Sequence, residues 1–257
     1  MTDVLCIRDR VGVVIGGTSG IGRALGLGLA AHGADVVAAG RRTAEIETTA
    51  KEIEAAGRRT LRHAADATKR ASLDELRDAV MKEFGRVDIL INAAGYTFKE
   101  ATATVTEEKW SALLDTNLNG VLRACQSFYP CLAACGRGRI INIASLGSFL
   151  SFHQVAAYCA AKTAILSLTR SLACEWAGEG ISVNAIAPGV FPTEMNGRLV
   201  TGTARGKEIL MRTPMRRFGK PEELVGIAVM LASDAASFLT GQCIAVDGGY
   251  LASGVNS

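Results

Sequence analysis

Short apolar runs alternate along the chain with longer segments whose apolar residues recur at helical spacing. Seven apolar runs are candidate strands: 11–15, 35–39, 60–64, 89–92, 139–143, 182–186 and 243–246. Most are rich in Val and Ile without clear alternation, as expected for parallel strands buried on both faces. The segments of helical period are 20–31, 44–56, 72–84, 107–134, 157–177 and 221–232. This α/β alternation predicts a doubly wound parallel sheet with helices on both faces.

Composition fits one compact domain over residues 1–257, because 49% of the residues are hydrophobic and 21% are charged. The formal net charge is only +3 and acids are interleaved with the bases, which argues against a nucleic-acid partner. The N-terminus lacks the pattern of a signal peptide, and no apolar run has membrane-spanning length. We therefore expect a cytoplasmic protein that binds neither nucleic acid nor membrane.

The seven cysteines include no CxxC pair, so they indicate neither a disulfide framework nor a zinc site. Reduced, mostly buried thiols are the prediction, and no metal is expected. Cys159 follows Tyr158 directly and is either a packed small hydrophobe or, if exposed, a reactive thiol.

A glycine-rich turn follows the first predicted strand and opens the first predicted helix. Its candidate binding residues are Gly16, Thr18, Ser19, Gly20, Ile21 and Gly22. Such a turn brings backbone amides close to a phosphate, and the helix N-terminus adds about half a positive charge. A P-loop needs Lys and then Ser or Thr after the last glycine, where this chain has Arg23 and Ala24. The turn favours dinucleotide binding, with a purely structural turn as the alternative.

Tyr158 and Lys162 are four residues apart in a predicted helix, so their side chains share one face. A nearby ammonium favours phenolate, which would lower the tyrosine pKa from about 10. Ser145 lies thirteen residues before Tyr158, and its hydroxyl could join the pair. The three side chains predict a proton-transfer site, whereas a surface Tyr/Lys pair is the plain alternative.

In their order along the chain, several motifs resemble the classical short-chain dehydrogenases/reductases. These are Gly16-x-x-x-Gly20-Ile21-Gly22, Asn92-Ala93-Ala94-Gly95, Asn117, Ser145, Tyr158-x-x-x-Lys162 and Pro188-Gly189. The resemblance covers essentially the whole chain. It implies a single-domain, seven-stranded doubly wound (Rossmann) fold, a nicotinamide cofactor and a homotetramer. It also implies hydride transfer between the cofactor and a secondary alcohol or ketone.

The resemblance also implies catalytic roles for Asn117, Ser145, Tyr158 and Lys162. Tyr158 would be the general acid in carbonyl reduction, and Lys162 would favour its phenolate in the reverse direction. Ser145 would bond the reacting oxygen, and Asn117 would hold a water that relays protons. Taken singly, Ser145 could instead cap a turn and Asn117 could bond helix backbone.

The implied cofactor site extends well beyond the glycine turn. Its further candidates are Arg41, Arg42, Asp66, Ala67, Asn92, Ala93, Gly95, Tyr158, Lys162, Pro188, Gly189 and Val190. Asp66 resembles the family aspartate at the adenine, although it could be a plain turn residue. An arginine after the second strand suits a 2′-phosphate, so NADP(H) is favoured over NAD(H).

Two positions depart from the family pattern, because Ile15 stands where threonine is usual and Ala93 where a second asparagine is usual. Replacing both members of a hydrogen-bonded pair with apolar groups can be nearly neutral. We therefore expect Ile15 and Ala93 to lie near one another on adjacent central strands.

The substrate is the least determined part of the prediction. Residues 146–155, 96–99 and a mobile loop of about 190–212 are expected to form the pocket. His153, Gln154, Asn196 and Arg198 favour a polyol, sugar or sugar acid, although each could be a solvated loop residue.

Residues 211–223 resemble gluconate 5-dehydrogenase-like members of the family, and many acyl-carrier-protein reductases carry a similar stretch. A 3-oxoacyl-(acyl-carrier-protein) reductase-like enzyme therefore stays open. A non-catalytic dinucleotide-binding sensor is the alternative from another class. The intact set of Ser145, Tyr158 and Lys162 favours an enzyme over that sensor.

Overall fold

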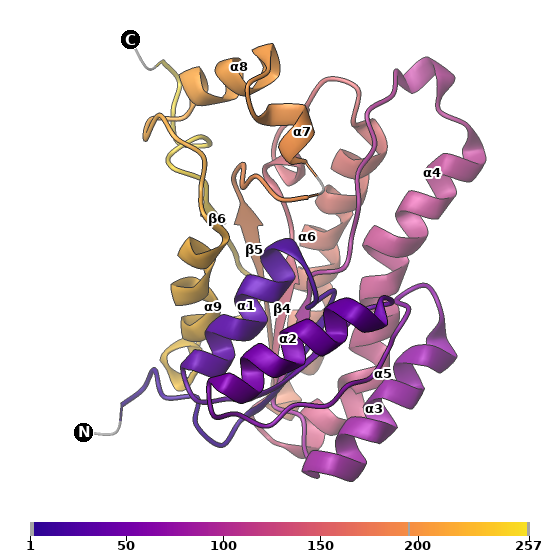
Figure 1. Ribbon diagram of the computed structural model, residues 1–257, viewed down its shortest axis with the longest axis vertical. Helices are drawn as coiled ribbons and strands as arrows, with labels where there is room; N and C mark the ends of the chain where they lie inside the picture. The colour runs from indigo at the N-terminus through magenta and orange to yellow at the C-terminus, as the bar shows by residue number, and fades with distance from the viewer. Residues whose placement is uncertain (1–2, 195, 256–257) are drawn as a thin grey trace.

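A parallel β-sheet forms the centre of the computed structural model, which describes residues 3–194 and 196–255 (Figure 1). Six strands pair in the order β2-β1-β3-β4-β5-β6. They are β1 (Val11–Ile15), β2 (Asp35–Ala39), β3 (Ile89–Asn92), β4 (Arg139–Ile143), β5 (Ser182–Pro188) and β6 (Cys243–Val246). The order changes direction at β1 and β3, whose carboxyl ends therefore form the crevice where such sheets bind ligands.

The prediction of a seventh strand at 60–64 is wrong. This segment runs beside the outer edge of β2. Within the described chain, its strand pairing there is limited to one isolated bridge between Gly40 and Ala64. Its residues are half-buried or exposed, so it lacks the two-sided burial of the central strands. Ion pairs hold this edge instead: Arg58 with Asp35, Arg59 with Glu83, and Arg62 with Glu47 and Glu54.

Helices cover both faces of the sheet (Figure 1). One face carries α1 (Gly20–Ala31), α2 (Thr43–Ala55) and α9 (Val225–Ala232). The other carries α3 (Arg70–Phe84), α5 (Gly120–Ala134) and α6 (Ala156–Trp176). The predicted helix 107–134 is α4 (Glu107–Leu114) and α5 joined by a π-helical segment, Asp115–Asn119. Two short helices, α7 (Gly197–Val200) and α8 (Ala204–Arg212), stand above the sheet.

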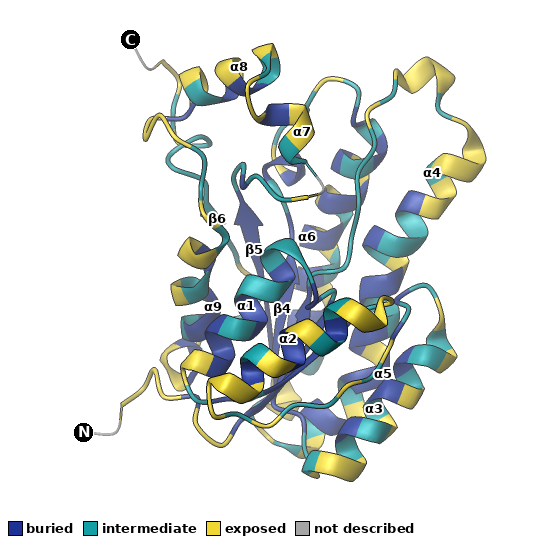
Figure 2. Cartoon of the chain, in the orientation of Figure 1, coloured by how far each residue is buried: buried dark blue, intermediate teal, exposed yellow. Residues whose placement is uncertain are grey.

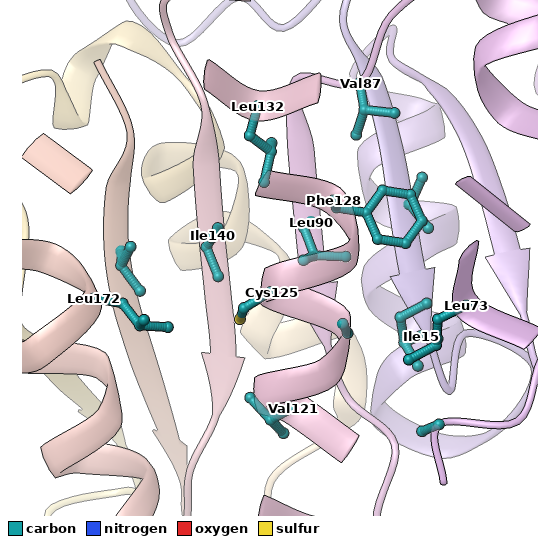
Figure 3. Close-up of a cluster of buried hydrophobic side chains, with 14 of the residues drawn as sticks. Ile15, Leu73, Val87, Leu90, Val121, Cys125, Phe128, Leu132, Ile140 and Leu172 are labelled. Carbon is teal, nitrogen blue, oxygen red and sulfur yellow. The ribbon is translucent and has the colours of Figure 1, made fainter. Parts of the chain in front are cut away.

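Two hydrophobic clusters hold these layers together, and the inner helix faces and the sheet are buried in Figure 2. In the cluster of Figure 3, Phe128 and Leu132 of α5 lie over Leu90 of β3 and Ile140 of β4. Each is at most 1% exposed, and burying a side chain of this size contributes about 1.5–3 kcal/mol. The clusters therefore fix the helices that carry the site.

Ile15 and Ala93 are backbone neighbours, as expected, because Ala93 N donates to Ile15 O at 2.9 Å. However, the Ile15 side chain belongs to the cluster under α5, whereas Ala93 packs against the cluster under α1. The two side chains thus lie on opposite faces of the sheet. They do not form the compensating apolar pair that motivated the expectation.

Within residues 3–194 and 196–255, no helix has the length and apolar character needed to cross a membrane.

Candidate active site

A cleft of about 450 Å³ opens at the carboxyl ends of the strands, where the chain leaves β1, β2, β3, β4 and β5. Most of the predicted cofactor residues line it. They are Gly16, Thr18, Ser19, Gly20, Ile21, Gly22, Arg41, Arg42, Asp66, Ala67, Ala93, Gly95, Tyr158, Lys162, Pro188 and Gly189.

The structure does not bring Asn92 and Val190 into this cleft. Strand geometry turns the Asn92 side chain into the core, where Nδ2 donates to Asn142 Oδ1 at 2.9 Å. Val190 lines an adjoining pocket of about 240 Å³, which shares Gly189 and Phe191 with the cleft.

Several cleft residues were not predicted from the sequence. They include Gly40, Thr68 and Thr116, whereas Phe191, Thr193 and Glu194 lie in the expected substrate loop of about 190–212 without having been singled out. Thr193 lies over the start of α1, because its Cγ2 would be 3.3 Å from a Cβ added to Gly20. Thr193 could have been proposed from the sequence, because it lies five residues after Pro188, close to the carboxyl end of a predicted strand.

The glycine turn forms a close-fitting phosphate cradle. Gly16 has φ +83°, and a Cβ on it would be 2.6 Å from the backbone nitrogen of Ala94. A Cβ on Gly22 would be 2.2 Å from Gly16 O. Ser19 precedes α1 without a side-chain capping bond, so the first amides of the helix remain available to an anion. This donor set fits the pyrophosphate of a dinucleotide.

At the other end of the cradle, Arg41, Arg42 and Asp66 surround the position after β2. Arg42 pairs with Glu45 at 3.1 Å, whereas Arg41 has no ion pair among the described residues. Asp66 Oδ1 accepts from Thr68 N at 3.0 Å and from Thr68 Oγ1 at 2.7 Å. Burial alone would raise the Asp66 pKa, but the Thr68 bonds and the Arg41 charge outweigh it and lower the pKa. Asp66 is therefore an ionised acceptor.

Ser145, Tyr158 and Lys162 meet at the opposite end of the cleft. Tyr158 and Lys162 share one face of α6, and Lys162 Nζ is 5.8 Å from the Tyr158 ring centroid. Nζ donates to Ile143 O at 2.7 Å, and Lys162 is only 5% exposed. Ser145 caps the turn after β4 through a 3.0 Å bond from Gly147 N, and its hydroxyl is close enough to the Tyr158 phenol to favour a lower pKa of that phenol. Ser145 thus caps a turn, as one interpretation expected, and also lies with Tyr158 and Lys162 at the cleft, as the other predicted.

The electrostatics at this end correct one expectation. Burial raises the Tyr158 pKa, and the bond with Ser145 opposes this only in part. The expected lowering of the Tyr158 pKa by Lys162 is therefore wrong for the protein alone, because burial of the phenol outweighs it. Burial also lowers the Lys162 pKa to about 8. Tyr158 is therefore a protonated phenol at neutral pH, suited to donating a proton.

Asn117 is fully buried in the π-helical turn between α4 and α5. Its Oδ1 accepts from Tyr96 N at 3.0 Å, and its Nδ2 donates to Tyr96 O at 2.8 Å. The side chain thus holds the segment after β3 rather than helix backbone, and keeps Tyr96 at the cleft wall.

Cys159, the residue after Tyr158, is only 9% exposed, as predicted for a packed thiol. In the part of the chain that the structure describes, no group of three or more His, Cys, Asp or Glu could hold a metal ion.

The fold and the site define a dinucleotide-binding oxidoreductase, and comparisons with known proteins agree. The family described as Enoyl-(Acyl carrier protein) reductase matches residues 15–251. The chain is 39% identical over 247 residues to 2-dehydro-3-deoxy-D-gluconate 5-dehydrogenase of Escherichia coli, covering 96% of this chain and 97% of that protein. It is 36% identical over 251 residues to gluconate 5-dehydrogenase of Gluconobacter oxydans, covering 98% of each.

Among solved structures, a gluconate 5-dehydrogenase from Burkholderia cenocepacia in complex with NADP and tartrate matches with a TM-score of 0.93. It is 34% identical, and the match covers 98% of this chain and 99% of that one. The chain therefore belongs to the short-chain dehydrogenase/reductase family. It is an NAD(P)-dependent oxidoreductase that acts on CH–OH groups.

Proposed function

We propose that this protein is an NADP(H)-dependent dehydrogenase of a polyol, sugar or sugar acid. The observation that carries the proposal is the cleft that joins the phosphate cradle to Ser145, Tyr158 and Lys162. Relatives named for 2-dehydro-3-deoxy-D-gluconate and gluconate support the substrate class. The solved relative with NADP and tartrate, a small hydroxy acid, supports it as well.

The residues at the catalytic end divide the proton chemistry. When bound, the nicotinamide supplies or accepts the hydride. In carbonyl reduction, the Tyr158 phenol donates its proton to the substrate oxygen as negative charge develops there. The Ser145 hydroxyl donates a hydrogen bond to the same oxygen. The Lys162 ammonium stabilises the Tyr158 phenolate that remains. In alcohol oxidation that phenolate accepts the proton of the substrate hydroxyl.

NADP(H) over NAD(H) is the finer part of the proposal. Arg41 borders the cleft beside Asp66 and is exposed, with no ion pair among the described residues. Its guanidinium is thus available to a 2′-phosphate, which it can bind with two parallel hydrogen bonds. Arg42 adds a second positive charge beside Arg41, but its guanidinium is already paired with Glu45.

The remaining roles and the assembly are also proposals. We propose that Asn117 holds a proton-relay water and that residues 1–257 act as one cytoplasmic domain. Residues of about 190–212 would form its substrate loop, in which Met195 lies outside the described residues.

A homotetramer is supported by the edge of β6, which among the described residues pairs with β5 alone, and by Phe238, whose side chain is fully exposed. Light scattering after size exclusion tests the tetramer, and a monomer would contradict it.

A substrate panel tests the proposed function. Alditols, aldonates, 3-oxoacyl thioesters and simple ketones are assayed with NADP(H) and NAD(H), for the wild type and for Tyr158→Phe. Turnover of an alditol or aldonate that Tyr158→Phe abolishes is the expected result. Preferred turnover of 3-oxoacyl thioesters would favour the acyl-carrier-protein reductase. Cofactor binding without turnover of any substrate would favour the sensor.

A further inference from the structure

Ser145 lies in a short loop, residues 143–148, that is hydrogen-bonded to α6 at both of its ends. We call these residues the serine loop. At its start, the carbonyl oxygen of Ile143 accepts from Lys162 Nζ at 2.7 Å. At its end, the Ser148 hydroxyl donates to the backbone oxygen of Lys162 at 2.6 Å. A single residue of α6 therefore fixes the serine loop on either side of Ser145.

Both bonds are shielded from solvent. Ser148 is 8% exposed and Lys162 is 5% exposed, so water competes little for these donors and acceptors. Tyr158 lies one helical turn before Lys162, on the same face of α6. The two bonds thus set the position of the serine loop against the part of α6 that carries the phenol.

One short helical turn, Leu146–Ser148, connects Ser148 to Ser145. Ser148 N donates to Ser145 O at 2.9 Å, and Gly147 N donates to Ser145 Oγ at 3.0 Å. The second bond uses the Ser145 hydroxyl as an acceptor, so the hydroxyl proton is available for donation toward the cleft. The place and the direction of this hydroxyl therefore depend on the turn that Ser148 ends.

Thr163 of α6 also approaches the serine loop, but its contacts there are weaker. Thr163 Oγ1 lies 3.4 Å from Gly147 O and from Ser148 O, whereas it bonds Cys159 O of its own helix at 2.9 Å. Contacts of 3.4 Å are long for a hydroxyl donor and contribute little. Ser148 itself does not line the cleft, so its hydroxyl can influence the reaction only through the serine loop.

We propose that Ser148 is a positioning residue, which holds the Ser145 hydroxyl where it and the Tyr158 phenol reach the same substrate oxygen. The proposal rests on the proposed function, because it takes Ser145 to hydrogen-bond that oxygen. Without the Ser148 bond, the serine loop would be tied to α6 mainly through Lys162 Nζ, and Ser145 would shift relative to Tyr158. A misplacement of about 1 Å can lower a rate by up to about a hundredfold.

A double-mutant cycle tests whether Ser148 acts through Ser145. Gluconate oxidation with NADP⁺ is measured for the wild type, Ser148→Ala, Ser145→Ala and the double variant. We expect Ser148→Ala to lower kcat about tenfold and to leave KM near wild type. In the Ser145→Ala background, the same change should lower kcat by less than about twofold, because no hydroxyl is left to position.

Two further variants complete the kinetic test. Ser148→Cys fills the same space with a weak donor and should lie between Ser148→Ala and the wild type. Thr163→Val removes an exposed hydroxyl near the same loop and should resemble the wild type. An equal loss of kcat from Ser148→Ala in both backgrounds would make Ser148 a general structural residue and overturn the proposal. Unchanged kcat in Ser148→Ala would overturn it as well.

Crystal structures of the wild type and Ser148→Ala give a readout without turnover. Ser145 Oγ should move away from the Tyr158 phenol in the variant, while Lys162 Nζ keeps its bond to Ile143 O. A Ser145 side chain that stays in place would overturn the proposal. If the wild type did not oxidise gluconate, that result would count against the proposed function, and the position of Ser145 in the two structures would still decide the role of Ser148.

Discussion

Asn142 on β4 donates a 3.0 Å hydrogen bond to Thr169 Oγ1 on α6, and neither residue is more than 1% exposed. Asn142 also accepts from Asn92 Nδ2 at 2.9 Å, so a buried polar chain joins two central strands to the helix. Asn142 precedes Ile143, whose carbonyl binds Lys162 of the same helix. The chain therefore sets the position of α6 against β4, on which the catalytic end depends.

Removing the Thr169 hydroxyl should destabilise the protein. Thr169→Val keeps the shape of the side chain but leaves Asn142 Nδ2 buried without this acceptor, at a cost of about 1–3 kcal/mol. Thr169→Ser keeps the hydroxyl and should lose less. Urea denaturation of both variants measures the difference in the free energy of unfolding. Equal stability of Thr169→Val and wild type would contradict the role of this bond.

Lys162 should make the cofactor-free protein more stable as the pH rises. Burial lowers its pKa in the folded state to about 8 from the ordinary 10.5, so between these values the unfolded chain binds more protons. Stability then rises by about 2 kcal/mol from roughly pH 7.5 to roughly pH 9.5. The raised pKa of Tyr158 acts in the opposite sense, but only near its ordinary value of 10.0 and above.

Lys162→Met provides the control for that titration. Denaturation of the variant at both pH values removes the contribution of Lys162 and keeps every other titrating group. The rise in the free energy of unfolding between the two pH values should be smaller in Lys162→Met by about 2 kcal/mol. The same slope in both proteins would show that Lys162 keeps its ordinary pKa in the folded state.

Arg41 should determine the choice of cofactor. Arg41→Ala is expected to lower kcat/KM with NADPH by about 10- to 100-fold, the loss of a charge-assisted pair, and to leave NADH little changed. Arg42→Ala is the matched control and should have the smaller effect, because Glu45 already neutralises Arg42. Steady-state kinetics with both cofactors decide the matter. A wild-type enzyme that prefers NADH strongly would refute the proposal.

Gly22 and Gly26 of α1 should respond oppositely to alanine. A Cβ on Gly22 would lie 2.2 Å from Gly16 O, whereas one on Gly26 would lie 3.7 Å from the nearest atoms, on Val14 and Val36. Gly22→Ala should therefore distort the phosphate cradle and weaken cofactor binding. Gly26→Ala fits and should stabilise the helix by up to about 1 kcal/mol. Fluorescence titration with NADPH and thermal unfolding of both variants measure these effects, and normal binding by Gly22→Ala would contradict the cradle.

The central strands were predictable because local sequence and tertiary environment agree. Residues 11–15 and 139–143 are apolar runs that are buried on both faces, and their predicted bounds match the structure. Residues 60–64 also contain apolar side chains, but Arg62 within the segment forms ion pairs with α2, and Arg59 just before it forms one with α3. The acids of those pairs lie in other parts of the chain. The residues of 60–64 taken alone therefore resembled a strand.

The site was predictable where spacing fixes geometry, as for Tyr158 and Lys162 on one helix face. The pKa of Tyr158 was not, because spacing does not reveal how deeply a side chain is buried. The role of the Asn117 side chain depends on Tyr96, 21 residues away, and that of the Ser148 hydroxyl on Lys162, 14 residues away. Such contacts follow from the folded chain and have no local pattern.

In the part of the chain that the structure describes, the ion-paired segment along β2 leaves the sheet one edge, that of β6, at which further strands could add. A second copy that joined there through a twofold axis would consume the open edge of both molecules. Growth along the sheet would stop at that pair, so open-ended fibres by strand addition are blocked. The ion pairs of Arg58, Arg59 and Arg62 thus limit how the protein can associate with itself.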